Sequence, residues 1–387
     1  MNDMASTNDT ASKRTAFGNE RGVALVIIIF GLVVLVGLIA GIFTASVLEH
    51  RTGQGFRPSE QAFNSAEAGL TEALADWNSG EWNLLPVLGT STFAGSLPGG
   101  TGAYSGSVRR LSNEIFLLDV TGTSARGDAR QRLGVYAKLR QASMGIEAAL
   151  TIRGRGRIGG NARVQGVDST PPGWASCPPV GGPQAGIRTP DASELDFFGA
   201  CSGASCVTGT PKIEQDPGID DSTFFNYGDA DWASLIANAD KQFPGGSYQQ
   251  LGPRLTADGK CDTAHPLNWG DPINPVGPCR SYFPIIHVNG DLTVSAGVGQ
   301  GLLLIEGDLN AQGGFEFFGI VIIKGRLKTA GSGNHFNGGV MAANVDLQES
   351  SALGDAEIQF SSCAVLRAQQ AAGVGAPLRT RGWVQLF

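Results

Sequence analysis

The stretch Arg21-Gly22-Val23-Ala24-Leu25-Val26 opens an apolar run that decides how this chain is organised. The run continues to Phe43 without a charged or amide side chain. Its 21 residues from Val23 would form a helix about 30 Å long, which matches the hydrocarbon core of a bilayer. Because the run has no polar face, it does not fit a helix that is buried on one side in a soluble domain. We therefore expect a membrane-spanning helix.

The residues ahead of the run indicate its orientation. Lys13, Arg14 and Arg21 form a basic flank of the kind that normally stays in the cytoplasm. The long remainder of the chain is therefore expected outside the cytoplasm. A cleaved secretory signal is the alternative, but such signals have a shorter apolar core, and Thr44-Ala45-Ser46 is a weak cleavage site.

Three segments carry a resemblance to a known family: Glu20-Arg21-Gly22, Val23-Ala24-Leu25-Val26, and Phe63-Asn64-Ser65-Ala66-Glu67-Ala68-Gly69-Leu70. Together they resemble the PilX-type minor pilins of type IV pilus systems. The resemblance implies that a prepilin peptidase cuts between Gly22 and Val23, which removes a cytoplasmic leader and keeps the helix. It also implies a single-pass inner-membrane protein with a periplasmic bulk that later reaches the pilus or cell surface. Other pilins and pilus assembly proteins would be its partners.

One position departs from the pattern of most pilins. Major pilins carry a glutamate five residues after the cleavage site, where this chain has Ile27. A carboxylate in hydrocarbon is tolerated only when it is paired, so its absence removes one contact with a neighbouring subunit. PilX-type proteins and the tip pseudopilin of type II secretion systems share this lack. A minor subunit near the tip of a pilus is favoured, and a pseudopilin-like tip component is the alternative.

Glycines and a proline shape the expectations for the helix itself. Gly37 and Gly41 form a G-x-x-x-G pattern, a spacing that lets two helix backbones approach closely. Gly53, Gly55 and Pro58 are expected to loosen or kink the helix just beyond the membrane.

An antiparallel sheet is predicted after the helix. Residues 103–110, 115–121 and 130–140 have the pattern of strands separated by polar turns, and the third alternates apolar with polar side chains. A long helix followed by such a meander is the pilin plan. The apolar face of the helix beyond Phe63 is expected to pack on this sheet.

A repeat marks the last third of the chain. Val288-Asn289-Gly290-Asp291-Leu292, Ile305-Glu306-Gly307-Asp308-Leu309 and Ile323-Lys324-Gly325-Arg326-Leu327 superimpose, with glycines 17 and 18 residues apart. Short apolar strands at a fixed period predict a mostly-β right-handed solenoid, or β-helix-like domain, similar to bactofilin repeats. A looser copy ends at Val345-Asp346-Leu347, and residues 150–164 could form an earlier coil. An antiparallel sandwich is the alternative.

Six cysteines fall in or after a long insertion between the early coil and the repeats: Cys177, Cys201, Cys206, Cys261, Cys279 and Cys363. An even number in an exported chain predicts disulfides, although six cysteines allow 15 pairings. Short loops favour Cys201 with Cys206 and Cys261 with Cys279, which leaves Cys177 for Cys363. Their spacing does not match a zinc site.

Patterns that could carry chemistry are weak. Asp291 and Asp308 occupy equivalent repeat positions and could stack about 5 Å apart, as catalytic or calcium-binding carboxylates do in some β-helix proteins. The next equivalent residue is Arg326, which favours simple charge balance. An acidic cluster between Asp216 and Asp231 does not match an EF-hand loop. The sequence Gly154 to Gly159 has the letters of a dinucleotide motif, but strand-like residues follow it instead of a helix.

These observations lead to one interpretation. The chain is expected to be a non-enzymatic minor pilin-like subunit without cofactor or metal, and a net charge of −7 argues against nucleic-acid binding. A membrane-tethered glycan-binding or glycan-acting β-helix protein is a further alternative. The expected segments are a leader (1–22), the transmembrane and pilin helix (23–78), a meander (79–143), a first coil (144–167), the Cys/Pro/Gly-rich insertion (168–284), solenoid repeats (285–362), and a C-terminal helix and strand (363–387).

Overall fold

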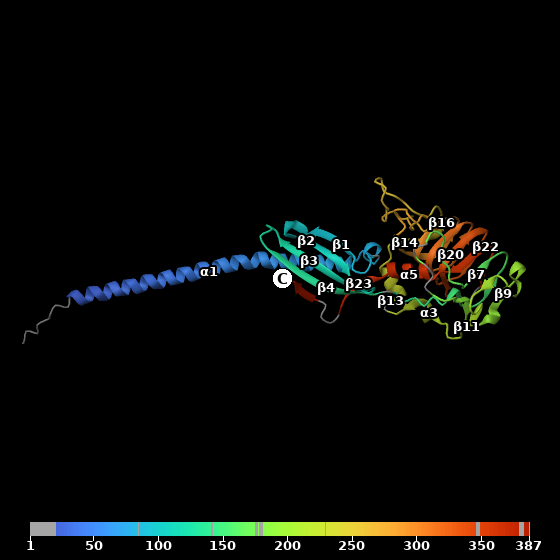
Figure 1. The fold of residues 1–387 in the computed structure, drawn as a ribbon, viewed down its shortest axis with the longest axis horizontal. Coiled ribbons are helices and arrows are strands. Elements are labelled where there is room, and N and C mark those ends of the chain that lie inside the picture. Colours follow the sequence, from blue (N-terminus) through green and yellow to red (C-terminus); the bar gives the residue numbers. More distant parts are fainter. Residues whose placement is uncertain are drawn as a thin grey trace, which may run out of the picture.

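The computed structural model describes residues 21–83, 85–140, 142–174, 177, 181–228, 230–345, 349–378 and 383–386. Most of the expected leader therefore lies outside the described residues, as do Asp346 and Leu347 of the looser fourth repeat. Figure 1 shows a long helix that projects from a small β-sheet lobe, with a larger β-rich lobe at the opposite end.

Helix α1 (Arg21–Ala75) is one element of 55 residues, about 80 Å long. The loosening or kink expected near Gly53, Gly55 and Pro58 does not end the helix, which continues through Pro58. A proline removes one backbone hydrogen bond, but the turns on both sides keep their own bonds. A short helix, α2 (Ser79–Trp82), follows α1.

The predicted meander is present. Strands β1 (Thr90–Ser96), β2 (Gly102–Arg110), β3 (Ile115–Ser124) and β4 (Arg130–Arg140) pair antiparallel in chain order. A 3-10 turn, η1 (Pro98–Gly100), joins the first two. Strand β3 alternates half-buried and buried residues along its whole length, which is the mark of a sheet with one face on a core.

The C-terminal strands form one edge of this sheet. Strands β23 (Val374–Pro377) and β24 (Trp383–Leu386) both pair antiparallel with β4, at its two ends. The sheet order is therefore β1-β2-β3-β4-β23, with β24 also on β4. The strand expected within residues 363–387 therefore lies on the meander.

The β-rich lobe is built on a curled sheet of parallel strands. Its longest path is β10-β7-β22-β20-β18-β16-β15-β17-β19-β21-β6-β9. All pairings within it are parallel, so an antiparallel sandwich is wrong. The strands from the repeats are β15 (Ile285–Val294), β16 (Gly297–Ile305), β17 (Leu309–Gln312), β18 (Phe315–Ile323), β19 (Leu327–Ala330), β20 (Ser332–Ala342), β21 (Ser350–Ala352) and β22 (Asp355–Phe360).

The repeats stack on one another in register. Leu292 pairs with Leu309, and Leu309 with Leu327, at the offsets of 17 and 18 that the sequence repeat predicts. The early coil, made of β5 (Ala148–Ile152), β6 (Gly156–Ile158) and β7 (Arg163–Gln165), joins the same stack. It lies beside β20, β21 and β22, the last repeats in sequence, and not ahead of the first.

The insertion extends both ends of the stack, which the sequence did not indicate. Its strand β14 (Lys241–Tyr248) pairs with β15, and β8 (Ala185–Thr189) pairs with β5. Its remaining elements are η2 (Ala192–Glu194), β9 (Leu195–Phe197), η3 (Gly199–Ala204), β10 (Val207–Thr208), β11 (Ile213–Gln215), α3 (Asp221–Phe225), β12 (Asn226–Tyr227), β13 (Ala230–Asp231) and α4 (Trp232–Ala237). The C-terminal helix α5 (Ser362–Ala371) packs on the curled sheet and leads back to the meander.

Buried polar residues join the two lobes. The buried Asn83 accepts a hydrogen bond from the Trp77 indole at 2.7 Å and donates to the carbonyls of Gln370 and Gly373 at 2.7 Å each. Arg110, also buried, donates to the carbonyl of Asn83 at 2.8 Å. Both side chains thus donate to backbone carbonyls at the junction, where a buried donor left unpaired would be costly. The junction is therefore specific and not a flexible linker.

The repeated glycines make room for a ladder of carboxylates. One oxygen of Asp291 accepts the Asp308 amide hydrogen at 2.8 Å, and one oxygen of Asp308 accepts that of Arg326 at 2.8 Å. A Cβ placed on Gly307 would lie 2.1 Å from the Asp291 oxygen, and one on Gly325 would lie 2.4 Å from the Asp308 oxygen. Glycine at these positions is thus required by the close approach of the preceding coil.

Gly325→Ala should destabilise the β-rich lobe by about 2 kcal/mol, because the added methyl group would displace the Asp308 carboxylate from its amide partner. Gly145→Ala is the matched control, since a Cβ there meets no atom within 4 Å. Denaturant midpoints of the full chain in detergent measure both variants. Equal midpoints for the two would contradict the ladder.

Candidate functional site: the exposed apolar half of helix α1

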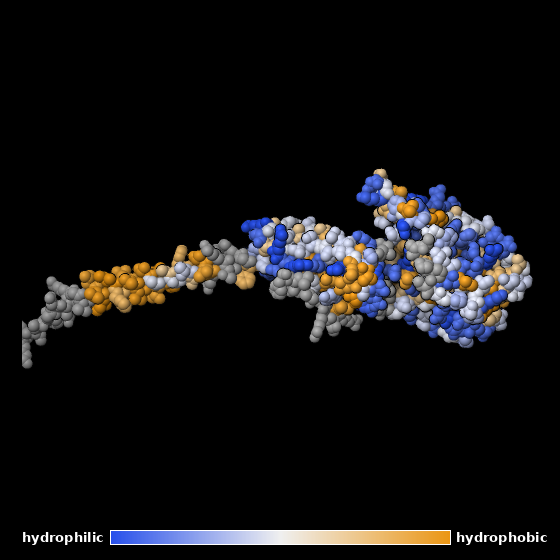
Figure 2. Space-filling view, in the orientation of Figure 1, coloured by the Kyte–Doolittle hydropathy of each residue, from blue (hydrophilic) through white to orange (hydrophobic). Residues whose placement is uncertain are grey.

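Helix α1 divides into two halves with opposite surroundings. Leu25–Leu48 is long and apolar enough to span a membrane, with a mean hydropathy of 3.2, and none of it is buried. Its large apolar side chains are 38% to 70% exposed. Figure 2 shows that much of the visible surface of the projecting helix is hydrophobic. Burial of a large apolar side chain is worth about 1.5–3 kcal/mol of free energy relative to leaving it in water. Because this half exposes many such side chains, it requires a membrane or a partner surface.

The second half packs on the meander. Its buried face consists of Ala62, Ala66, Leu70, Ala73 and, just past the helix, Trp77. These side chains meet the inner face of the sheet, including Val108, Phe116, Leu118 and Val120. The expectation that the apolar stripe beyond Phe63 packs on the chain's own sheet is confirmed for these positions, whereas Phe63 itself is 41% exposed.

Small residues set the distance between helix and sheet. A Cβ on Gly122 of β3 would lie 2.1 Å from the Ala62 carbonyl oxygen and 2.3 Å from the Ala66 nitrogen. One on Gly102 of β2 would lie 2.1 Å from the Ser65 hydroxyl. The sheet backbone therefore rests almost directly on the helix backbone, and the sequence pattern alone did not reveal these glycines.

The predicted helix-packing glycines lie in the exposed half. A Cβ on Gly37 or Gly41 would meet no atom within 4 Å, so their surface is open to another helix. Thr44, one turn further, donates its hydroxyl to the carbonyls of Ala40 and Gly41 at 3.0 and 2.9 Å. This polar group is satisfied within the helix. Ile27, at the position of the pilin glutamate, is 65% exposed.

The predicted cleavage pair, Gly22 and Val23, lies in the first turn of α1. Whether the chain is cut between them stays a prediction.

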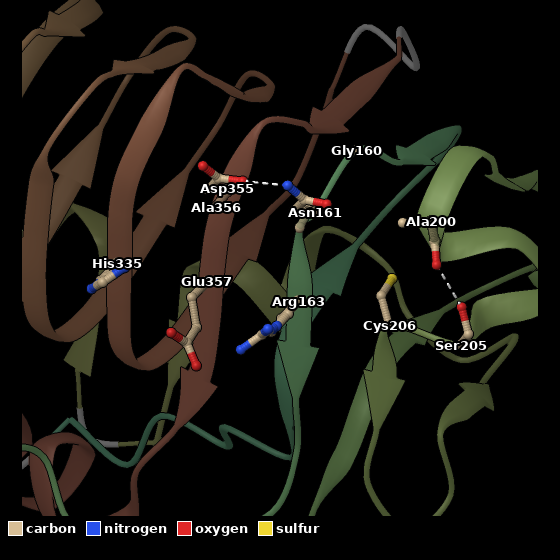
Figure 3. Close-up of a pocket in the computed structure, with 11 residues that line it drawn as sticks. Gly160, Asn161, Arg163, Ala200, Ser205, Cys206, His335, Asp355, Ala356 and Glu357 are labelled. Atoms are coloured by element: carbon tan, nitrogen blue, oxygen red, sulfur yellow. Dashed lines mark hydrogen bonds between the residues drawn. The ribbon is translucent and has the colours of Figure 1, made fainter.

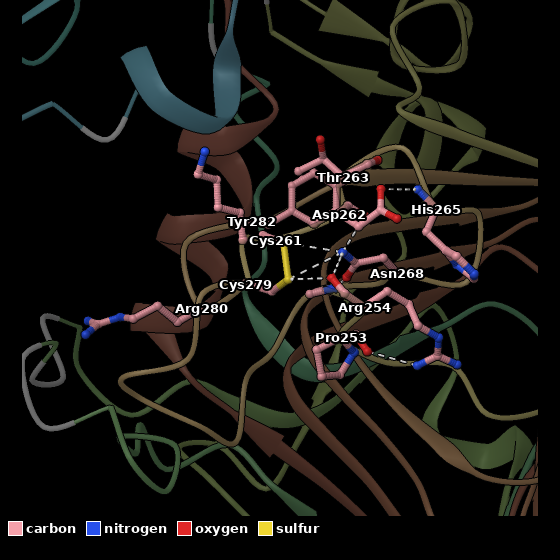
Figure 4. Close-up of a disulfide and its surroundings, with 12 residues drawn as sticks. Pro253, Arg254, Cys261, Asp262, Thr263, His265, Asn268, Cys279, Arg280 and Tyr282 are labelled. Carbon is pink, nitrogen blue, oxygen red and sulfur yellow. Dashed lines mark hydrogen bonds between the residues drawn. A yellow bond between two sulfur atoms is a disulfide. The ribbon is translucent and has the colours of Figure 1, made fainter. Parts of the chain in front are cut away.

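The cysteines are joined as Cys201–Cys206 and Cys261–Cys279, the pairs that short loops favour, and as Cys177–Cys363, the pair that then remains. Figure 4 shows the last of these beside Asn268, whose amide contacts both sulfur atoms, at 3.3 and 3.4 Å. The same amide donates to the Asp262 carbonyl at 2.7 Å. Cys177–Cys363 ties the insertion to the start of α5.

The candidate catalytic carboxylates have structural contacts. Asp308 receives hydrogen bonds from the Arg326 guanidinium, at 3.0 Å from Nε, and forms an ion pair with Lys328 at 3.3 Å. Asp291 is used in the amide ladder. Within the acidic cluster, Asp220 and Asp231 cap the short helices α3 and α4. Two other members of the cluster form ion pairs: Asp216 with Arg188 and Asp221 with Arg153. Asp229 lies outside the described residues.

A polar hollow of about 550 Å³ lies over β20, β22 and β7 (Figure 3). Asn161 donates to Asp355 across it at 2.8 Å, and Ser205 donates to the Ala200 carbonyl at 2.8 Å. His335 and Glu357 are neighbours on adjacent strands. Among the described residues, no group of three or more His, Cys, Asp or Glu is arranged to hold a metal ion. The letters Gly154 to Gly159 lead into strands β6 and β7, with no helix after them.

Comparison with known proteins does not assign the chain to a family. No protein-family model and no curated protein sequence match the chain. Among solved structures, it is similar to the competence-associated pilin ComZ from Thermus thermophilus, with 12% identity over 85% of this chain and 97% of that chain. The TM-score is 0.23, and a similarity at this level carries no conclusion about this chain.

Acid should weaken the contact between Asp308 and its cations. Burial raises the pKa of Asp308, but the hydrogen bonds from Arg326 and Lys328 outweigh this, so the pKa lies below its usual 3.8. A carboxyl whose pKa is lower in the folded state stabilises the fold above its unfolded pKa and loses that effect as the pH falls. We therefore expect the stability difference between the natural chain and Asp308→Asn to shrink from about pH 6 to about pH 3. Denaturant titrations across this range measure it, and a constant difference would contradict the assignment.

Proposed function

We propose that the chain is a minor pilin-like structural subunit of a type IV pilus, acting in pilus assembly or in display at the tip. One observation carries the proposal. A single uninterrupted helix has one half buried in its own domain and the other half, Leu25–Leu48, wholly exposed and apolar. This division suits a helix that sits first in a bilayer and later among the helices of neighbouring subunits, because both surroundings cover the same apolar surface.

The assembly sequence follows from this division. Prepilin peptidase would remove the leader after Gly22, and the helix from Val23 would hold the subunit in the inner membrane with both lobes in the periplasm. On extraction, the open backbone at Gly37 and Gly41 would let the helix pack against other pilin helices. The partners are therefore other pilins and pilus assembly proteins.

The β-rich lobe would be the displayed part. We propose that its curled parallel sheet is a short right-handed β-solenoid, because successive repeats pair at offsets of 17 and 18 residues and share one core. Three disulfides and the polar junction at Asn83 would keep it in a fixed position beyond the meander. Such rigidity suits a domain exposed outside the cell.

A structural role is proposed instead of an enzymatic one. The glycan-acting alternative depended on Asp291 and Asp308, and both carboxylates are engaged by the next coil. A pseudopilin-like tip component of a type II secretion system remains the second candidate, favoured by Ile27 at the position where most pilins carry glutamate. Both candidates place the subunit at the start of a fibre.

Processing tests the proposal. In cells with an active prepilin peptidase, the chain recovered from membranes should begin at Val23, as shown by intact mass and N-terminal sequencing. Without the peptidase it should stay uncut. Gly22→Leu should prevent cleavage, whereas Gly18→Leu, the same change four residues upstream, should not. An uncut chain in all cells, or one that begins beyond Ala45, would refute the pilin assignment.

A further inference from the structure

Strand β1 is an open edge of the meander. The described residues include one strand paired with it, β2, whereas on the opposite side of the sheet β4 is paired with β23 and β24, which form the other edge. The β1–β2 register is regular across all seven residues, from Thr90 opposite Arg109 to Ser96 opposite Ala103. The strand Thr-Ser-Thr-Phe-Ala-Gly-Ser contains no charge and no proline. Proteins that keep an edge strand unpaired usually protect it with lysine, proline or a bulge, and β1 has none of these.

The register identifies the backbone groups that face outward. Leu97 donates to the Gly102 carbonyl and Arg110 donates to the Gly89 carbonyl, so the odd-numbered residues of β1 bond to β2. The amide and carbonyl groups of Thr90, Thr92, Ala94 and Ser96 therefore point to the open edge. The side chains of these four residues are exposed as well.

The surfaces on both sides of this edge suit an added strand. On the outer face, a shallow hollow of about 670 Å³ is bordered by the Asp119–Arg132 ion pair. Next to the edge it is lined by small residues: Thr92, Ala94, Ser105, Gly106 and Ser107. Their size leaves room for larger side chains of a partner.

The inner face leaves an aromatic ring incompletely covered. Phe93 is half-buried, with its ring 5.7 Å from Trp82 and 6.4 Å from Tyr104. An added strand would cover the rest of this ring and would also pair with the open amides. Water can hydrogen-bond the amides but cannot cover the ring.

The direction of the strands limits the partner. If β1 paired antiparallel with the β1 of a second copy, a two-fold axis would relate the two copies. Helix α1 of the second copy would then point in the opposite direction to that of the first. Two copies anchored in one membrane cannot pair like that. The four successive antiparallel pairings make β1 and β24 parallel to each other. Copies in the same orientation could therefore join β24 of one to β1 of the next.

We propose that β1 is a docking edge for a second copy of this chain, whose C-terminal strand β24 adds to it as a parallel strand. The inference rests on the proposed function, because it requires both copies to be anchored in the same orientation. The contact is head-to-tail and extends the sheet from one subunit to the next. It also makes the C-terminal strand a structural part of the assembly.

Crosslinking in membranes tests the docking edge. All six cysteines are paired, so Thr92→Cys gives the full chain a single free thiol, which can carry a benzophenone maleimide. Illumination should yield an adduct of twice the chain mass, with the crosslink mapped by mass spectrometry to residues 383–386. Arg126→Cys, in the exposed turn between β3 and β4, should not give this adduct.

A proline at the edge separates docking from folding. Ala94→Pro removes an outward amide without breaking a bond to β2, so the meander should fold while the Thr92→Cys adduct falls at least tenfold. Ala94→Val keeps the amide and should leave the adduct unchanged. Absence of the adduct, an adduct with a different protein, or equal yields for proline and valine would overturn the proposal. Cleavage after Gly22 is scored in the same samples, so failure of docking is distinguishable from failure of the pilin assignment.

Discussion

The close packing of α1 on the meander is the contact on which the rest of the molecule depends. Gly122 brings the sheet backbone against Ala62 and Ala66, and the alanines and leucines beyond them fill the space between helix and sheet. Because this contact occupies only the second half of a continuous helix, the first half cannot fold back onto the domain. It is left as an exposed apolar helix, which a bilayer or other apolar helices would cover.

The same sheet also positions the β-rich lobe. Helix α5 leads from the curled sheet to β23 and β24, which complete the meander on the side of β4. Asn83 and Arg110 fix this crossing with hydrogen bonds to backbone carbonyls. The first and last parts of the chain thus form one module, and the middle of the chain forms the other. A force on the helix would therefore reach the β-rich lobe through the meander and these hydrogen bonds.

Much of this plan could be predicted from local pattern. The apolar run, the meander and the spacing of Gly290, Gly307 and Gly325 are features of short segments, and each determines its structure through burial or close backbone approach. The order of the coils could not be predicted, because the pairing of β5, β6 and β7 with the last repeats joins segments about 190 residues apart. The role of Asn83 was hidden for the same reason, since its partners lie near residue 370. Helix α1 continues through Pro58, because the loss of one backbone hydrogen bond does not end a helix whose neighbouring turns keep their own bonds.

The most direct measurement is the environment of α1 in lipid bilayers, read from spin labels on single added cysteines of the full chain. A label at Leu35 should collide with oxygen and be shielded from a water-soluble nickel chelate. A label at Glu72, on the exposed side of the packed half, should show the reverse. These results would place the boundary between lipid and water within one continuous helix. A Leu35 label open to the nickel chelate would contradict the division of α1 between membrane and domain.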